Sequence, residues 1–319
     1  MKALFTRRSA VVYVGVAAAL ILSGCSSSVN DSAGEAAGDC GSYAIAMHAW
    51  NGYTASAQVV AEVAKANGCT ITQTTLDEGP TTYDAMEAGT IDLIIEDWGG
   101  GRWQEWSDRG AVIDSGENGN VGLIGMYVAP WMAEKYPDIV DSKNLNKYAD
   151  LFKTADSGGK GAWFEGPAGY TTIGEKMVGA NKLNFKVIFS GSEAALIDGF
   201  TKAEANKTAF IGYAWQPWTL FAKIPNLESG HVIFPANDWS DAAAASGLTD
   251  YPSTPLMKLV SKKLNEANDV FTTIVKNFSW TNDDQNGVAA DIEGGMTPEA
   301  AAQKWIDANP DKVKAWLGK

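Results

Sequence analysis

The chain has 319 residues, and its 25 Lys and Arg against 38 Asp and Glu give a formal net charge of −13. This charge argues against nucleic acid as a partner, because a phosphate-binding surface needs clustered basic residues. The length suggests two compact lobes, and a hydrophobic fraction of 45% supports real cores. The unusual feature is tryptophan, of which there are 12 against only 2 histidines.

The N-terminus has the pattern of a secretion signal. Three basic residues and no acid lie within residues 1–10, and the apolar run 11–22 is too short to span a bilayer. Small residues then precede Cys25, as in a bacterial lipoprotein signal. The pattern predicts a signal peptide over residues 1–24 and a lipid on Cys25. The alternative is an ordinary secretory signal with a chance cysteine.

A small, polar, non-periodic stretch over residues 25–39 predicts a flexible tether, so the folded part is expected to begin at Cys40. Cys40 and Cys69 each precede a strand-like segment, at 43–47 and 71–76, with a helix-like segment between them. Parallel neighbouring strands would bring the two cysteines within disulfide reach outside the cytoplasm. Two free thiols are the alternative.

From residue 40 onward, strand-like and helix-like segments alternate. Strands are expected over residues 43–47, 71–76, 91–96, 121–128, 161–164, 185–190 and 208–213. Helices are expected over residues 54–67, 81–88, 172–180, 193–205, 255–267, 270–278 and 298–309, with more helix in the last few residues. The alternation predicts an α/β fold with mainly parallel sheets, arranged as two lobes with a cleft between them.

Aromatic residues follow several of these strands. Trp50 comes after the first strand, Trp98 after the third, and Trp215 after the strand 208–213, while Tyr127 ends the strand 121–128. Ligands of such sheets bind beyond the C-terminal strand ends, so these side chains are predicted to face a ligand. Packing at a hinge between the lobes is the alternative.

Two further groups of residues are conspicuous in the sequence. Glu96 and Asp97 end a strand, where they either add negative potential for a cation or are solvated. We expect Trp280, Trp305 and Trp316 to belong to the core of the C-terminal helices.

Signatures of enzymes are missing from the sequence. It has no Gly-x-Ser-x-Gly elbow and no phosphate-binding loop, and its glycine run at 99–101 lacks a following Lys-Ser/Thr. His48 and His231 are too few for a histidine-rich metal cluster. The sequence therefore predicts a protein that is not an enzyme and that uses no cofactor and no metal.

Clustered tryptophans suit two classes of ligand. One is sugars, which stack on ring faces. The other is a cation with spread-out charge, such as a quaternary ammonium group, for which each ring contact contributes about 0.5–2 kcal/mol. Three or four rings around one such group supply several kcal/mol.

Short stretches in a fixed order suggest a family. They cover residues 48–53 (His-Ala-Trp-Asn-Gly-Tyr), 91–98, 125–131, 191–196 and 212–218, followed by a tail over 277–316. In this order, behind a lipoprotein signal, residues 40–319 resemble the substrate-binding proteins of ABC importers for glycine betaine, choline and related solutes. The resemblance implies a two-lobed, type II periplasmic-binding-protein-like fold with two hinge crossings. Lobe one would hold residues 40–124 and 220–319, and lobe two residues 125–219.

The resemblance also implies a binding site. The family's aromatic box maps onto Trp50, Trp98, Tyr127 and Trp215, and Tyr170, in a loop over residues 165–170, would close it. Further ligand contacts would come from Asn51, His48 and Trp218. Asn51 carries no charge, unlike the aspartate that can meet the hydroxyl in choline binders. The family often has a His between Pro217 and Trp218; without it, backbone amides or His48 would hold a ligand carboxylate.

The function implied is the capture of a quaternary ammonium solute outside the cytoplasm and its delivery to an ABC permease. Glycine betaine is the first candidate, beside choline, carnitine and proline betaine. The protein would be a monomer that touches the membrane only through its lipid. A sugar-binding lipoprotein and a surface lipoprotein without a transport role are the alternatives.

Overall fold

The computed structural model describes residues 40–98, 102–235 and 241–319. The predicted signal peptide 1–24 and tether 25–39, with the lipid site Cys25, lie outside the described residues. Within those residues, no helix combines the length and the apolar character needed to cross a membrane.

The first lobe is built on three parallel strands. Strand β1 (Ser42–Met47) lies between β2 (Thr70–Thr75) and β3 (Leu93–Asp97) and pairs with both in parallel. Three helices follow these strands along the chain: α1 (Asn51–Ala66), α2 (Pro80–Glu87) and α3 (Gln104–Asp108). The predicted strand–helix–strand unit is therefore present, and its register brings the N-terminal ends of β1 and β2 together.

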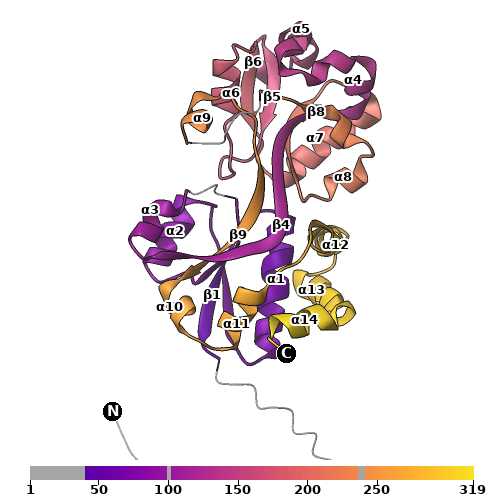
Figure 1. Cartoon of the computed structure of the whole chain (residues 1–319). Coiled ribbons are helices and arrows are strands. Elements are labelled where there is room, and N and C mark those ends of the chain that lie inside the picture. Colours follow the sequence, from indigo (N-terminus) through magenta and orange to yellow (C-terminus); the bar gives the residue numbers. More distant parts are fainter. Residues whose placement is uncertain (1–39, 99–101, 236–240) are drawn as a thin grey trace, which may run out of the picture. The chain divides into compact units, whose positions relative to one another are not determined.

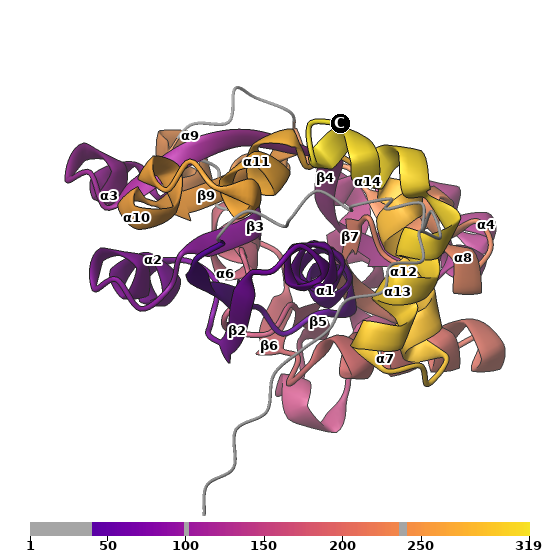
Figure 2. The same ribbon diagram turned by 90° about the horizontal axis from the view of Figure 1, so that it is seen from below.

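The C-terminal part of the chain returns to the first lobe (Figure 1). It forms α10 (Lys262–Glu266), α11 (Val270–Asn277), α12 (Asn282–Glu293), α13 (Pro298–Ala308) and α14 (Pro310–Trp316). Helices α12 and α13 pack against α1, which lies beside them in Figure 2. Segments from the two ends of the described chain thus share one core.

Two strands connect the lobes. The long β4 (Val112–Val128) leaves the first lobe, and β9 (Ser253–Ser261) returns to it antiparallel to β4 (Figure 1). The helix predicted over residues 255–267 is wrong, because its first part is strand β9. The physical reason is that β9 pairs on both sides, with β3 and with β4. Tertiary pairing of this kind overrides a short apolar run that fits either period.

The second lobe contains β5 (Gly161–Glu165), β6 (Phe185–Phe189), β7 (Ile211–Gln216) and the two-residue β8 (His231–Val232). Its helices are α4 (Pro130–Lys135), α5 (Leu145–Tyr148), α6 (Gly174–Ala180), α7 (Glu193–Asn206), α8 (Leu220–Lys223) and α9 (Asp241–Ser246). Short 3-10 turns lie at Pro137–Val140, Ser142–Asn144, Ala149–Phe152, Ala155–Ser157 and Leu227–Gly230.

The chain between residues 220 and 252 lies with the second lobe rather than the first. Strand β8 pairs with the second-lobe end of β4, and α9 contacts α6. We therefore propose that lobe two extends to about residue 252 and that the second crossing lies in β9, not near residue 220. This proposed boundary follows from the strand, rather than helix, over the first part of residues 255–267.

The sheet is mixed rather than mainly parallel. Its strand order is β2-β1-β3-β9-β4-β7-β5-β6, with β8 added to β4. Pairs inside each lobe, such as β1–β2 and β5–β6, are parallel, whereas β9 is antiparallel to β3 and to β4, and β4 is also antiparallel to β7. The β4–β9 pair is antiparallel because the two strands run between the lobes in opposite directions.

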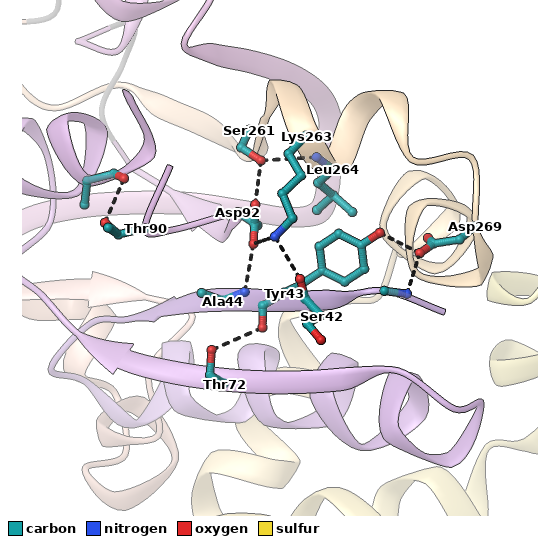
Figure 3. A network of polar contacts seen from close by, with 12 residues as sticks. Ser42, Tyr43, Ala44, Thr72, Thr90, Asp92, Ser261, Lys263, Leu264 and Asp269 are labelled. Carbon is teal, nitrogen blue, oxygen red and sulfur yellow. Dashed lines mark hydrogen bonds and ion pairs between the residues drawn. The ribbon is translucent and has the colours of Figure 1, made fainter. Parts of the chain in front are cut away.

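Buried polar contacts hold the base of the first lobe together (Figure 3). Asp92 accepts hydrogen bonds from the Ala44 N–H at 3.0 Å, from Ser261 Oγ at 2.9 Å and from Lys263 Nζ at 2.9 Å. One carboxylate therefore joins β1 to the end of β9 and to α10. Close by, Cys40 and Cys69 form a disulfide with an S–S distance of 2.07 Å, as the neighbouring starts of β1 and β2 predict.

Candidate ligand-binding site

A cavity of about 250 Å³, including space open to solvent, lies where residues of both lobes meet. Its lining is dominated by aromatic side chains, which we call the aromatic box: Trp50, Trp98, Tyr170, Tyr213 and Trp215. Glu78, Ile124 and Thr171 complete the lining. The first lobe supplies Trp50 and Trp98, and the second lobe supplies the other three rings.

Trp50 and Trp98 are brought together by the parallel pairing of β1 and β3. Trp50 is the N-cap residue of α1, three residues after β1, and Trp98 directly follows β3. Because parallel strands end at the same edge of a sheet, the two indoles face the same space. Both donate to Glu96 Oε1, Trp98 Nε1 at 2.8 Å and Trp50 Nε1 at 3.3 Å. Glu96 therefore fixes the orientation of both rings.

Glu96 itself is fully buried beneath the box. Burial raises its pKa to about 7, although the hydrogen bonds from Trp98, Ser56 and Trp50 oppose this rise. Ser56 Oγ donates to its second oxygen, Oε2, at 2.9 Å. Near neutral pH this carboxyl group can gain or lose a proton, so it responds to charge placed in the box.

A glycine in the first crossing strand allows Trp98 to approach closely. A Cβ on Gly122 would lie 2.6 Å from Trp98 Cζ3 and 2.8 Å from Leu256 Cδ2. Distances this short cannot be accommodated without moving the indole. The absence of a side chain at Gly122 therefore leaves the space that the Trp98 indole occupies.

On the opposite wall, Tyr213 and Trp215 are alternate residues of β7 and point to the same side of the strand. Trp215 stacks on Trp218, with ring centroids 4.0 Å apart and planes 7° apart. Tyr170 stands edge-on to Trp50 at 5.3 Å and to Trp215 at 5.6 Å. These ring contacts leave faces of the box directed at the cavity.

Hydrogen bonds bridge the lobes around the cavity. Tyr170 Oη donates to the Ala49 carbonyl at 2.8 Å, and the Asn51 N–H, at the start of α1, donates to Glu193 Oε2 at 3.0 Å. Burial raises the pKa of Glu193 to about 7, against the lowering effect of the Asn51 N–H. The arrangement is that of two lobes drawn together over the box.

The polar member of the lining is Glu78. Its Oε1 accepts from the Trp98 N–H at 3.0 Å, and its Oε2 accepts from Thr171 Oγ1 at 3.1 Å and lies 3.4 Å from Arg102 Nη2. Burial raises the pKa of Glu78, and the charge of Arg102 opposes that rise. A carboxylate beside aromatic faces favours a cation in the cavity.

Four of the eight residues predicted from the sequence line the cavity, namely Trp50, Trp98, Tyr170 and Trp215. Trp218 lies behind Trp215, and Asn51 takes part in the inter-lobe hydrogen bond. His48 stacks behind Trp50, with centroids 5.4 Å apart, and its Nδ1 lies 3.0 Å from the Leu76 carbonyl oxygen.

The structure places Tyr127 elsewhere. It is buried in the second lobe, stacked on His231 with centroids 4.6 Å apart, and edge-on to Phe221. The place expected for it in the box is taken by Tyr213. Tyr213 could have been found by alternation, because it lies two residues before Trp215, but the predicted strand ended too early. No local pattern marks Glu78, Ile124 or Thr171.

The chemistry of the site is that of recognition. Five rings and a buried carboxylate surround a small space, an environment suited to a cation with spread-out charge. In the ranges that the structure describes, no three or more His, Cys, Asp or Glu residues are grouped to hold a metal ion. The geometry supports binding without covalent chemistry.

Comparison with known proteins decides the family. Residues 41–308 match the family described as the substrate-binding domain of the ABC-type glycine betaine transport system. The chain belongs to this family. It is therefore the substrate-binding component of an ABC transport system rather than an enzyme, as the sequence predicts, and such components work outside the cytoplasm.

Individual relatives agree with this assignment. A glycine betaine/carnitine transport binding protein of Listeria monocytogenes is 29% identical over 127 residues, which is 40% of this chain and 38% of that protein. The trimethylamine N-oxide-binding protein of Pelagibacter ubique is 26% identical over 83% of this chain and 87% of its own length.

Among solved structures, an ABC-transporter choline-binding protein in complex with choline superposes with a TM-score of 0.72 at 19% identity, covering 88% of this chain and 92% of that one. This likeness confirms the predicted two-lobed fold of the type II periplasmic binding proteins.

Proposed function

We propose that this substrate-binding protein captures a quaternary ammonium compatible solute in the aromatic box and delivers it to a membrane permease. The observation that carries the proposal is the box itself, in which rings from two lobes surround one cavity beside Glu78. A quaternary ammonium group has no N–H to donate, so recognition depends on ring faces. Each contact contributes about 0.5–2 kcal/mol, and more when water is excluded.

The proposed capture mechanism follows from the division of the aromatic box between the two lobes. With the lobes apart, Trp50 and Trp98 would face solvent on one side, and Tyr170 and Trp215 on the other. A cation that contacts both walls stabilises the closed arrangement over the open one, because only the closed form offers all the rings. The bonds from Tyr170 to Ala49 and from Asn51 to Glu193 then hold the closed form. The permease would recognise the two lobes in this relative position.

Glycine betaine is the first candidate ligand, with choline, carnitine and proline betaine as others. The description of the family and the names of its relatives support this set, since glycine betaine, carnitine, choline and trimethylamine N-oxide each carry a nitrogen with three methyl groups. Glu78 supports the cationic end of all of them.

The proposal also covers the attachment of the protein to the membrane and its oligomeric state. We propose that Cys25 carries the lipid, that residues 25–39 tether the folded part to the membrane surface, and that the protein acts as a monomer. The signal-like pattern before Cys25 supports the anchor.

Calorimetric titration tests the proposal. The ligands are glycine betaine, choline, carnitine, proline betaine and trimethylamine N-oxide, with an oligosaccharide as the control. We expect saturable binding of at least one trimethylated ligand, together with a change in tryptophan fluorescence. Tight binding of the oligosaccharide alone would favour the sugar-binding alternative. A fluorescence spectrum that no ligand changes would favour a surface protein without a transport role.

A further inference from the structure

A second cavity adjoins the aromatic box and shares Trp98, Ile124, Tyr170 and Thr171 with it. Its volume is about 1,090 Å³, including space open to solvent. We call it the outer chamber; its further lining residues are Arg102, Gly122, Thr172, Ile173, Lys176, Ala244, Ala245, Tyr251, Pro252 and Thr254. Because the two spaces have a common wall, a ligand held in the box can extend into the outer chamber.

The two spaces differ in charge. The box is lined by five rings and one acid, Glu78. Among the described residues that line the outer chamber, Arg102 and Lys176 are basic and none is acidic. Among the described side chains, the acid Glu78 therefore lies at the inner end of the cleft, beside Arg102, and the base Lys176 lies at the outer end. A molecule with a cation at one end and an anion at the other matches this polarity.

The two basic residues are not equally available. Arg102 lies beside Glu78 at 3.4 Å and donates to Thr171 Oγ1 at 2.9 Å, so it is already engaged. Lys176 is exposed on α6, and no ion pair joins it to a side chain whose position the structure describes. An anionic group in the outer chamber therefore finds in Lys176 a positive charge that no described side chain pairs with.

We infer that the outer chamber is an anion subsite, in which Lys176 holds the negative end of a zwitterionic ligand whose trimethylammonium group occupies the box. This inference rests on the proposed function. Within the ligands proposed above, it places trimethylammonium acids whose carboxylate is separated from the nitrogen by several carbons, such as carnitine, ahead of glycine betaine.

The reason for the longer spacer lies in Glu78. In glycine betaine a single methylene separates the nitrogen from the carboxylate, so the carboxylate stays within the box, near the buried carboxylate of Glu78. Two like charges this close oppose each other in a desolvated space. A longer arm carries the carboxylate past the shared wall to Lys176, while the ammonium keeps its contacts with the rings.

Titration with three ligands at low salt separates the contribution of the aromatic box to binding from that of the outer chamber. Tetramethylammonium occupies the box alone, glycine betaine carries a short acidic arm, and carnitine carries a longer one. The variants are Lys176→Met and Lys176→Glu, with Lys160→Met as the control, because Lys160 is exposed and lines neither cavity. Lys176 is itself exposed, so its replacement leaves the fold intact.

We expect the wild-type protein to bind carnitine at least as tightly as glycine betaine. Lys176→Met should weaken carnitine binding about threefold and Lys176→Glu about tenfold, with smaller effects at high salt. The affinity for tetramethylammonium should change less than about twofold in Lys176→Met. The control Lys160→Met should change the affinity for neither carnitine nor tetramethylammonium.

Equal carnitine affinity in wild type, Lys176→Met and Lys176→Glu would overturn the anion subsite while leaving the box intact. The same loss for tetramethylammonium as for carnitine would also overturn it, because the effect would then not depend on the anion. Failure of the wild-type protein to bind any of the three would instead overturn the proposed function itself.

Discussion

Two regions of this protein concentrate its aromatic side chains, and they do so for different purposes. The aromatic box surrounds a cavity, and two of its indole N–H groups converge on one buried carboxylate. The second region, which we call the C-terminal cluster, contains Phe278, Trp280, Trp305 and Trp316. There, Trp305 and Trp316 stack with centroids 5.3 Å apart, and Trp316 meets Phe278 at 4.7 Å.

The difference lies in where the ring faces point. In the C-terminal cluster the rings cover one another and seal α13 and α14 onto the first lobe, as the sequence predicts for Trp280, Trp305 and Trp316. In the box, Trp50 and Trp98 are held by their polar edges, which leaves their faces for a ligand. The distinction is therefore whether a ring face is covered by another ring, as for Trp305 and Trp316, or borders the cavity, as for Trp50 and Trp98.

The largest effect that we expect is a loss of folding stability when a ring of the C-terminal cluster is removed. Trp316→Ala removes a ring that is only 2% exposed and whose Nε1 donates to the Ser279 carbonyl at 3.2 Å. We expect the free energy of unfolding to fall by about 3–5 kcal/mol, because the truncation leaves a cavity among packed rings. Denaturant unfolding followed by circular dichroism measures this change.

Ligand affinity provides the control for that variant. Because Trp316 lines neither cavity, Trp316→Ala should bind ligand like the wild type under conditions where it is folded. A loss of affinity without a loss of stability would show that the C-terminal cluster acts on the box, and the contrast between the two regions would fail.

In the aromatic box we expect the opposite result, in which a replacement lowers ligand affinity but changes stability little. Trp98→Ala should weaken binding of a quaternary ammonium ligand at least about tenfold, because it removes one cation–π face and the indole that Glu96 orients. Its thermal stability should change far less than that of Trp316→Ala, since one face of Trp98 borders a cavity. Calorimetric titration and thermal unfolding of both variants test this pair of outcomes.

A conservative replacement sharpens this test. Trp98→Phe keeps a ring face but loses the hydrogen bond to Glu96, so its affinity should lie between those of the wild type and Trp98→Ala. If Trp98→Ala melted as early as Trp316→Ala and bound ligand normally, the box would be a second packing cluster.

The sequence predicts part of this contrast. The rule that ligands bind beyond C-terminal strand ends selects Trp50, Trp98 and Trp215, and all three line one cavity, although Trp215 lies within β7. The same rule misleads for Tyr127, which lies on β4, a strand that runs between the lobes, and whose ring packs inside the second lobe. Position along a strand says where a side chain lies but not which lobe buries it.

Other features depend on contacts that are distant in the sequence. Glu78 reaches the box through bonds to Trp98, Thr171 and Arg102, and none of these partners can be inferred from its neighbours in the chain. Strand β9 was expected to be a helix because its apolar residues fit both periods, and only pairing with β3 and β4 decides between them. The position that we propose for the second crossing depends on the same pairing.

The smallest expected effect concerns the proton on Glu96, which has no counterpart in the C-terminal cluster. Burial raises the pKa of Glu96 to about 7 in the free protein. A cation in the box favours the ionised carboxylate and so lowers this pKa in the complex. Binding then releases a proton, and affinity should increase as the pH rises through 7.

Comparison of the wild type with Glu96→Gln isolates this effect, because Glu78 and Glu193 titrate in both proteins. A shift of about half a pKa unit corresponds to about a threefold gain in the wild-type affinity between pH 6 and pH 8, relative to Glu96→Gln. At pH 6, where Glu96 is mostly protonated, the two proteins should bind a quaternary ammonium ligand almost equally. Parallel pH profiles would mean that Glu96 only orients the two indoles and that its charge is not felt in the cavity.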